Sequence, residues 1–176
     1  MTIQALAQEV HQNALDHGWW DDDRGVYEIV ALIHSEWSEA LEEARAGRPL
    51  VWYADMSKKP EGIAVELIDG CIRILDYYGR INAQFDDPAT GFPYEIETLY
   101  AEDDDTITQK DVPTLVALLH AITSKVILED DNLNPLIEAM GTAMMWVKGR
   151  GIDPLALLME KHEYNKGRPY KHGKKF

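Results

Sequence analysis

Two pairs of acidic residues lie inside segments whose other residues predict buried helices. Glu36 and Glu39 are three residues apart in the first segment, and Glu66 and Asp69 are three residues apart in the second. On a helix, residues i and i+3 lie about 60° apart, so each pair presents two carboxylates from one face. In the first segment that face also carries the apolar residues Ile29, Leu32, Ile33 and Ala40. Solvated glutamates are expected on the opposite face.

Carboxylates inside an apolar stripe need a compensating charge. Two carboxylates about 5 Å apart repel by roughly 3 kcal/mol at an effective dielectric constant of 20, before any cost of desolvation. A bound divalent cation removes this repulsion, and oxygen ligands suit the hard ions Mg²⁺, Mn²⁺ and Ca²⁺. Helical bundles build metal sites from inward acidic pairs on facing helices. The pairs therefore predict a metal site, whereas either pair alone also fits a glutamate-rich surface helix.

The pattern of apolar residues predicts an all-α fold, a helical bundle. The predicted helices cover residues 2–17, 26–46, 61–78, 112–128, 135–148 and 154–165. Pro60, Pro113 and Pro154 suit first turns of helices, and Gly18 and Gly47 suit helix ends. The sequence contains no evident linker or repeat, so residues 1–176 are expected to form a single domain, which this length suits.

The predicted helix over residues 61–78 is apolar around most of its circumference. Its narrow polar stripe consists of Glu66, Asp69, Arg73 and Asp76. Periodicity alone does not distinguish this stripe from a solvent-facing one. The single cysteine, Cys71, fits a small core residue and excludes both an intrachain disulfide and a CxxC metal site.

Residues 81–111 interrupt the helical pattern. This stretch contains several prolines and glycines and an acidic run over residues 102–105, and it alternates weakly over residues 94–100. Connections of this length are uncommon in compact domains and are often functional or mobile. We therefore expect an irregular acidic insertion, with a short hairpin as one possibility over residues 94–100.

Charge and composition restrict the classes of function. The formal net charge of −14 argues against a general binder of nucleic acids or of anionic membranes. The sequence has no recognisable signal peptide and no apolar run of the length that spans a bilayer. The expected location is therefore the cytoplasm.

The end of the chain has the opposite charge. Residues 161–176 contain six Lys or Arg residues and one Glu. Lys161, Tyr164 and Asn165 share one helical face, and Arg168 follows shortly after it. Lysine supplies a point charge and arginine a forked donor, a combination that suits a polyphosphate. Because Mg²⁺ is commonly bound jointly by carboxylates and substrate phosphates, the acidic pairs and this basic segment form one consistent site. The alternative is a basic, frayed tail.

The spacing of the acids resembles that of a known family. Glu36-x-x-Glu39 followed by Glu66-x-x-Asp69 is similar to the ExxE…ExxD signature of the MazG-like, all-α nucleoside triphosphate pyrophosphohydrolases. The residues around both pairs and the ending that begins at Lys161 are similar as well. The resemblance covers residues 1–80 and 112–176, so the acidic insertion is a departure from the family. The resemblance implies a helical bundle that assembles as a homodimer or homotetramer.

The resemblance also implies an activity. Members of the family use Mg²⁺, with Mn²⁺ as a possible substitute, to cleave a nucleoside or deoxynucleoside triphosphate between the α and β phosphates. They release the monophosphate and pyrophosphate. Carried onto this sequence, the metal ligands and catalytic acids would be Glu36, Glu39, Glu66 and Asp69, with Glu39 as the candidate to orient water. The substrate-binding residues would be Lys161, Tyr164, Asn165, Arg168, His11 and Trp20, the last two contacting the base.

Two other classes of protein fit parts of this pattern. One is a catalytically silent helical interaction module, whose acidic faces bind a partner protein and explain the negative charge. The other is a redox-active carboxylate metalloprotein, which needs Glu-x-x-His pairs on its helices. Neither His34 nor His120 completes such a pair. Trp20 also has a second interpretation, as an aromatic residue that caps the core.

Overall fold

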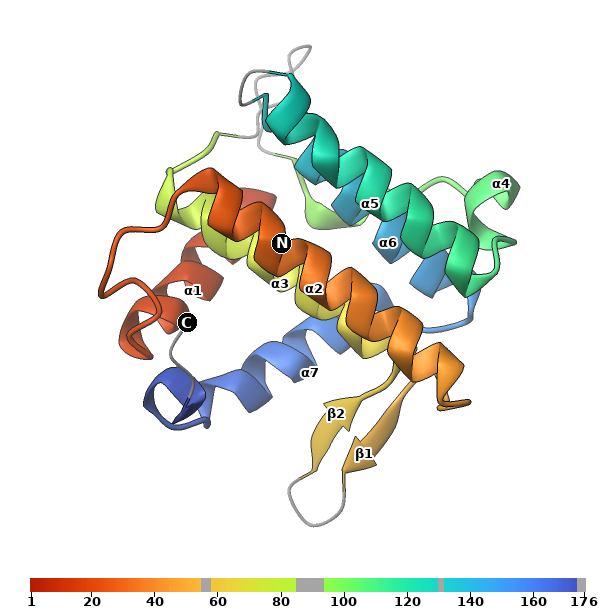
Figure 1. The fold of residues 1–176 in the computed structure, drawn as a ribbon, viewed down its shortest axis with the longest axis horizontal. Helices are drawn as coiled ribbons and strands as arrows, with labels where there is room; N and C mark the ends of the chain where they lie inside the picture. Colours follow the sequence, from red (N-terminus) through yellow and green to blue (C-terminus); the bar gives the residue numbers. More distant parts are fainter. Residues whose placement is uncertain (55–57, 85–93, 130–131, 174–176) are drawn as a thin grey trace.

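The computed structural model describes residues 1–54, 58–84, 94–129 and 132–173, and it confirms the all-α class (Figure 1). Its α-helices are α1 (Ile3–Asp16), α2 (Val26–Arg45), α3 (Ile63–Arg80), α4 (Asp105–Thr108), α5 (Val112–Leu128), α6 (Asn134–Gly149) and α7 (Pro154–Lys166). The third helix begins and ends two residues later than predicted, and the other predicted helices agree with the observed ones to within one residue. The structure also contains the strands β1 (Trp52–Ala54) and β2 (Lys59–Glu61) and the 3-10 helices η2 (Ile96–Tyr100) and η3 (Tyr170–Gly173).

Helix α3 is the centre of the molecule. It packs against α1, α2, α6 and α7 (Figure 1), and most of its side chains are buried. A helix that is apolar around most of its circumference buries itself in this way. Its polar stripe is therefore partly enclosed as well: Glu66 is buried, and Asp69, Arg73 and Asp76 are half-buried. Among the described residues, no helix is long and apolar enough to cross a membrane.

The contact between α2 and α3 depends on one small residue. Trp37 of α2 is fully buried, and its ring lies against Gly70 of α3 where a Cβ atom would overlap it. Trp37 Nε1 also donates a hydrogen bond of 3.1 Å to Thr123 Oγ1 of α5. Since α2 and α3 carry the two acidic pairs, this contact sets the distance between them.

The connection before α3 differs from the prediction. Pro60 was expected in the first turn of the helix, but it lies in β2, which pairs antiparallel with β1 in the register Tyr53↔Pro60. A short two-stranded edge tolerates proline because few backbone donors are needed there. Gly62, with φ of 115°, then turns the chain into α3 at Ile63. A side chain at Gly62 would collide with the carbonyl oxygens of the preceding loop.

The described part of the acidic insertion is anchored and contains no hairpin. The weak alternation over residues 94–100 corresponds to η2, whose Ile96 is fully buried in the core. An isolated bridge between Thr2 and Glu95 ties the segment to the start of the chain. The acidic run supplies a helix cap, because Asp104 accepts a hydrogen bond of 2.8 Å from the Thr106 amide at the start of α4. Residues 85–93 of the insertion lie outside the described residues.

We predict that Gly70→Ala destabilises the fold. The overlap with Trp37 outweighs the roughly 1 kcal/mol that alanine gains in helix propensity, leaving a net loss of about 1–3 kcal/mol. Urea unfolding followed by circular dichroism measures this loss. The matched control is Gly167→Ala, where φ is −84° and an added Cβ meets only the Tyr164 carbonyl oxygen at 3.5 Å, so its effect is expected to stay within a few tenths of a kcal/mol. Equal stability of the two variants would contradict the role of this contact.

Candidate active site

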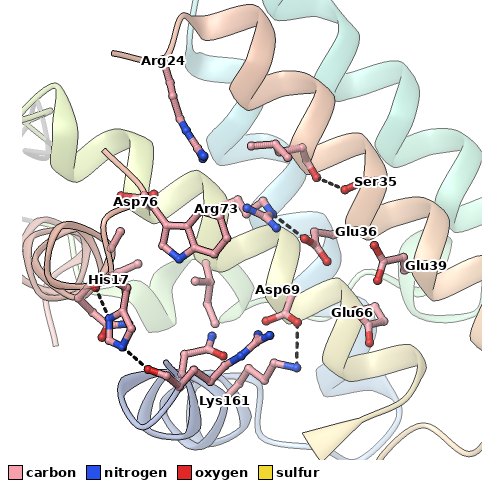
Figure 2. A pocket seen from close by; sticks show the side chains of 18 of the residues that line it. His17, Arg24, Ser35, Glu36, Glu39, Glu66, Asp69, Arg73, Asp76 and Lys161 are labelled. Atoms are coloured by element: carbon pink, nitrogen blue, oxygen red, sulfur yellow. Dashed lines mark hydrogen bonds and ion pairs between the residues drawn. The ribbon is translucent and has the colours of Figure 1, made fainter. Parts of the chain in front are cut away.

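A cavity of about 380 Å³ lies between α1, α2, α3 and α7 (Figure 2). Its acidic lining residues, from α2 and α3, are Glu36, Glu39, Glu66, Asp69 and Asp76. Its basic lining residues are Arg24, Lys59, Arg73, Lys161 and Arg168. The cavity thus places side chains of both charges around one space, as a ligand made of a cation and a polyanion requires.

Three of the acids form a compact group. Glu36, Glu39 and Glu66 each offer a carboxylate oxygen, and these oxygens lie within 4.8 Å of one another. Glu36 and Glu66 are only 5% and 6% exposed, whereas Glu39 is exposed. Figure 2 shows the three side chains facing one another across the gap between α2 and α3. The donor set is all oxygen and suits a hard divalent ion.

Asp69 lies in the same cavity, but its carboxylate pairs with a lysine and is not part of the group of three glutamates. Its Oδ2 atom is 2.9 Å from Nζ of Lys161, whose side chain is 2% exposed. Lys161 Nζ also donates to the Pro60 carbonyl oxygen at 3.1 Å. The sequence led us to expect Lys161 among the phosphate ligands, and the structure places its ammonium group on one of the acids. Figure 2 shows this ion pair directly beside the three glutamates.

Arg73 also belongs to the site, although the sequence identified it only as one residue of the polar stripe of α3. Its Nε atom is 2.5 Å from Oε1 of Glu36, and it lies one turn after Asp69 on the same face of α3. The spacing of Glu66, Asp69 and Arg73 was the available signal, since it aligns the three residues on one helical face. Arg73 holds Glu36 in place, and it adds a second cation to the acidic group.

Burial and mutual repulsion shift the pKa values of the acids. Burial and the neighbouring charge of Asp69 raise the pKa of Glu66 to about 8, and Glu36 and Glu39 act in the same direction. Burial also raises the pKa of Asp69. Burial lowers the pKa of Lys161, but Asp69 and Glu66 reverse that effect and leave it above its ordinary value. At neutral pH, Glu66 therefore keeps its proton unless a cation takes its place.

Some of the predicted C-terminal site residues line the cavity, and one does not. Asn165 and Arg168 line it, whereas Tyr164 is half-buried and is not among its lining residues. Asn165 Oδ1 is buried, and no described polar group bonds to it. His17, which the sequence analysis did not single out, also lines the cavity, and its Nε2 atom is 2.9 Å from the Arg168 carbonyl oxygen. This contact ties the end of α7 to the end of α1.

His11 and Trp20 lie beside the cavity and not in its lining. His11 Nδ1 is 2.7 Å from Asp76 Oδ1, and Trp20 Nε1 donates to the same oxygen at 2.9 Å. The aromatic residue of this loop that lines the cavity is Trp19, over whose ring Arg24 lies at 5.4 Å. The sequence does not show which of the adjacent residues Trp19 and Trp20 points into the cavity, because the directions of their side chains depend on the turn that follows Gly18.

No protein-family model, no curated protein and no solved structure matches this chain. A fold class alone does not define a function. The function is therefore inferred from the residues of the cavity, their distances and their charges.

The raised pKa of Glu66 predicts how stability depends on pH. Between about pH 4.5 and pH 8 the native chain holds a proton that the unfolded chain has released, so the free energy of unfolding falls as the pH rises. We expect a total loss of about 2–4 kcal/mol for the metal-free protein over this range, and a smaller loss for Glu66→Gln. Urea unfolding at several pH values with a chelator present measures both. Identical pH dependence of the two proteins would contradict the burial of an ionisable Glu66.

Proposed function

We propose that this protein hydrolyses a nucleoside or deoxynucleoside triphosphate to the monophosphate and pyrophosphate, with Mg²⁺ as its cofactor and Mn²⁺ as a substitute. The observation that carries the proposal is the joint presence, in one cavity of about 380 Å³, of a three-carboxylate group and several cationic side chains. This volume is in the range of small-molecule sites. The fold that the proposal assigns is the MazG-like helical bundle, in which acidic pairs on adjacent helices hold the metal.

The charge balance of the acidic group supports a divalent ion. The three grouped glutamates and the neighbouring Asp69 supply four carboxylates, and two cations pair with them: Arg73 with Glu36, and Lys161 with Asp69. When all are ionised, two negative charges remain in excess. A single divalent ion cancels this excess, and its binding would displace the proton of Glu66. Glu36, Glu39 and Glu66 would hold the ion, which neutralises phosphate charge and lowers the pKa of a bound water.

The other side of the cavity suits the phosphate chain. Figure 2 shows Arg24 and Arg73 directed into the space that the acids and Lys161 border. Arg168 and Asn165 line the same space from the end of α7. Guanidinium groups bind phosphate oxygens with two parallel hydrogen bonds, and the unsatisfied oxygen of Asn165 can accept one from a ligand hydroxyl or amine. Trp19 lines the same cavity, and a base would stack on its ring beside Arg24.

Glu39 is the best placed of the acids to act on water. It is exposed, whereas Glu36 is held by Arg73 and Glu66 is buried. In the proposed reaction a water oxygen attacks the α-phosphorus, the bond to the bridging oxygen breaks, and pyrophosphate leaves. Glu39 would orient the water and accept its proton. Positioning and charge stabilisation supply most of the rate enhancement in such reactions.

The decisive experiment is a panel of ribonucleoside and deoxynucleoside triphosphates with Mg²⁺ or Mn²⁺, in which pyrophosphate and orthophosphate are measured separately. We expect equal amounts of monophosphate and pyrophosphate from at least one nucleotide. Release of orthophosphate would show that the protein cleaves a bond other than the one between the α and β phosphates. No turnover with any nucleotide and either ion would favour the silent interaction module.

We predict that Glu39→Gln lowers turnover by about 100-fold or more while the fold stays as stable or becomes more stable, because repulsion within the acidic group is relieved. Steady-state kinetics and urea unfolding measure the two effects. Glu42→Gln is the matched control, since Glu42 is exposed on the same helix and pairs with Arg45 at 2.7 Å. Near-normal turnover of Glu39→Gln would show that the site is wrongly assigned.

A further inference from the structure

The loop between α1 and α2, residues 17–25, carries two side chains that line the cavity. Trp19 lies near its start and Arg24 near its end, and the Arg24 guanidinium lies over the Trp19 ring, 5.4 Å from its centroid. Residues 21–23, between them, are exposed. An exposed loop holds its side chains in place only where other contacts fix it. The contacts that the loop makes with other parts of the chain therefore decide how firmly Trp19 is held.

Residues 168–171, which we call the C-terminal segment, pack against the start of this loop (Figure 1). His17 Nε2 is 2.9 Å from the first carbonyl oxygen of the segment, and the Lys171 amide donates a hydrogen bond of 3.0 Å to the His17 carbonyl oxygen. The Tyr170 ring lies against Gly18, where an added Cβ atom would overlap it. Gly18 has φ of 74°, so this position requires glycine for its backbone conformation as well as for the space that the ring occupies.

The C-terminal segment also holds the middle of the loop, through Asp21. The Tyr170 hydroxyl donates a hydrogen bond to Asp21 Oδ2, and Lys171 Nζ is 3.1 Å from the same oxygen. Hydrogen bonds from Tyr170 and from Lys171 lower the pKa of Asp21, so its carboxylate is ionised at neutral pH. Asp21 is only two residues from Trp19, so the loop is fixed on both sides of that ring.

We propose that Tyr170 and Lys171 are positioning residues that set the affinity of the site for the base of its substrate, because they anchor the loop that carries Trp19. Neither residue is among those that line the cavity, and neither would touch the substrate. A ring that is already fixed loses little conformational entropy when a base stacks on it, whereas a mobile ring must first be ordered. This inference rests on the proposed function, in which a base stacks on Trp19.

The phosphate-binding side of the cavity is held by other contacts. Arg24 Nε is 3.2 Å from Glu28 Oε1 in the first turn of α2. The guanidinium of Arg73 is paired with Glu36 on the same helix. Loss of the anchor should therefore weaken the binding of a nucleotide and leave the binding of inorganic tripolyphosphate, which has no base, unchanged. A variant that merely disturbed the fold would weaken both.

Tyr170→Phe tests the proposal, because it removes the hydroxyl and keeps the ring against Gly18. With the nucleoside triphosphate that is turned over fastest, we expect KM to rise about 3–10-fold and kcat to stay within about two-fold of the wild-type value. The inhibition constant of inorganic tripolyphosphate should also stay within about two-fold. Tyr27→Phe is the matched control, since Tyr27 is 62% exposed on α2 and is not among the residues that line the cavity.

A double-mutant cycle tests whether Tyr170 acts through Asp21. Asp21→Ala removes the acceptor of both Tyr170 and Lys171, so it should raise KM at least as much as Tyr170→Phe does. Adding Tyr170→Phe to Asp21→Ala should then change KM no further, because the hydroxyl has already lost its partner. Additive effects of the two substitutions would overturn the proposed route from Tyr170 to Trp19.

Amide hydrogen exchange tests the anchor without any substrate. A peptide covering residues 19–24 should exchange about 3–10-fold faster in Tyr170→Phe than in the wild-type protein or in Tyr27→Phe. Unchanged exchange, or equal losses of affinity for nucleotide and tripolyphosphate, would overturn the proposal. Faster exchange without turnover of any nucleotide would show that the anchor exists but that the proposed function, and with it the role in base binding, is wrong.

Discussion

The mutual repulsion of carboxylates buried between α2 and α3 is the constraint on which the rest of the site depends. The close contact of Trp37 with Gly70 holds the two helices together and so forces Glu36 and Glu66 into the same interior space. Uncompensated, such a group would oppose folding by several kcal/mol. The chain compensates in three ways: Arg73 pairs with Glu36, Lys161 pairs with Asp69, and Glu66 retains a proton.

These three compensations leave some negative charge unbalanced, and this remaining charge makes the cavity suitable for a cationic ligand. An ion pair made only for stability would leave no excess of charge, since buried charges are normally matched by their partners. Here one negative charge remains in excess while Glu66 is protonated, and two when it is ionised. The oxygens that carry the excess face a cavity that Arg24, Arg168 and Asn165 also line. Perturbed ionisable groups in a cavity that also carries complementary charges are typical of catalytic sites. The proposed hydrolysis of a nucleoside triphosphate uses both the carboxylates, which would hold the metal ion, and the cationic side chains, which would bind the phosphates.

Much of this architecture follows from the sequence, and the remainder depends on packing. The helices and their buried faces are encoded locally, because apolar periodicity fixes which side of each helix is buried. The approach of Glu36, Glu39 and Glu66 also requires the packing of α2 on α3, and that packing leaves Glu39 exposed. The hairpin around Pro60 was missed because Pro60 fits either an edge strand or a first helical turn. The pairing of Lys161 with Asp69 depends on how α7 crosses α3, which no local pattern specifies. The choice of Trp19 over Trp20 depends likewise on the conformation of one turn.

Proton release on metal binding tests the central claim most directly. Calorimetric titration with Mg²⁺ or Mn²⁺ at pH 7, in two buffers of different ionisation enthalpy, counts the protons displaced per ion. If the buried carboxylates bind the ion, about one proton is released per ion by the wild-type protein and about none by Glu66→Gln, which also binds more weakly. Saturable binding without proton release, or no saturable binding at all, would contradict the account.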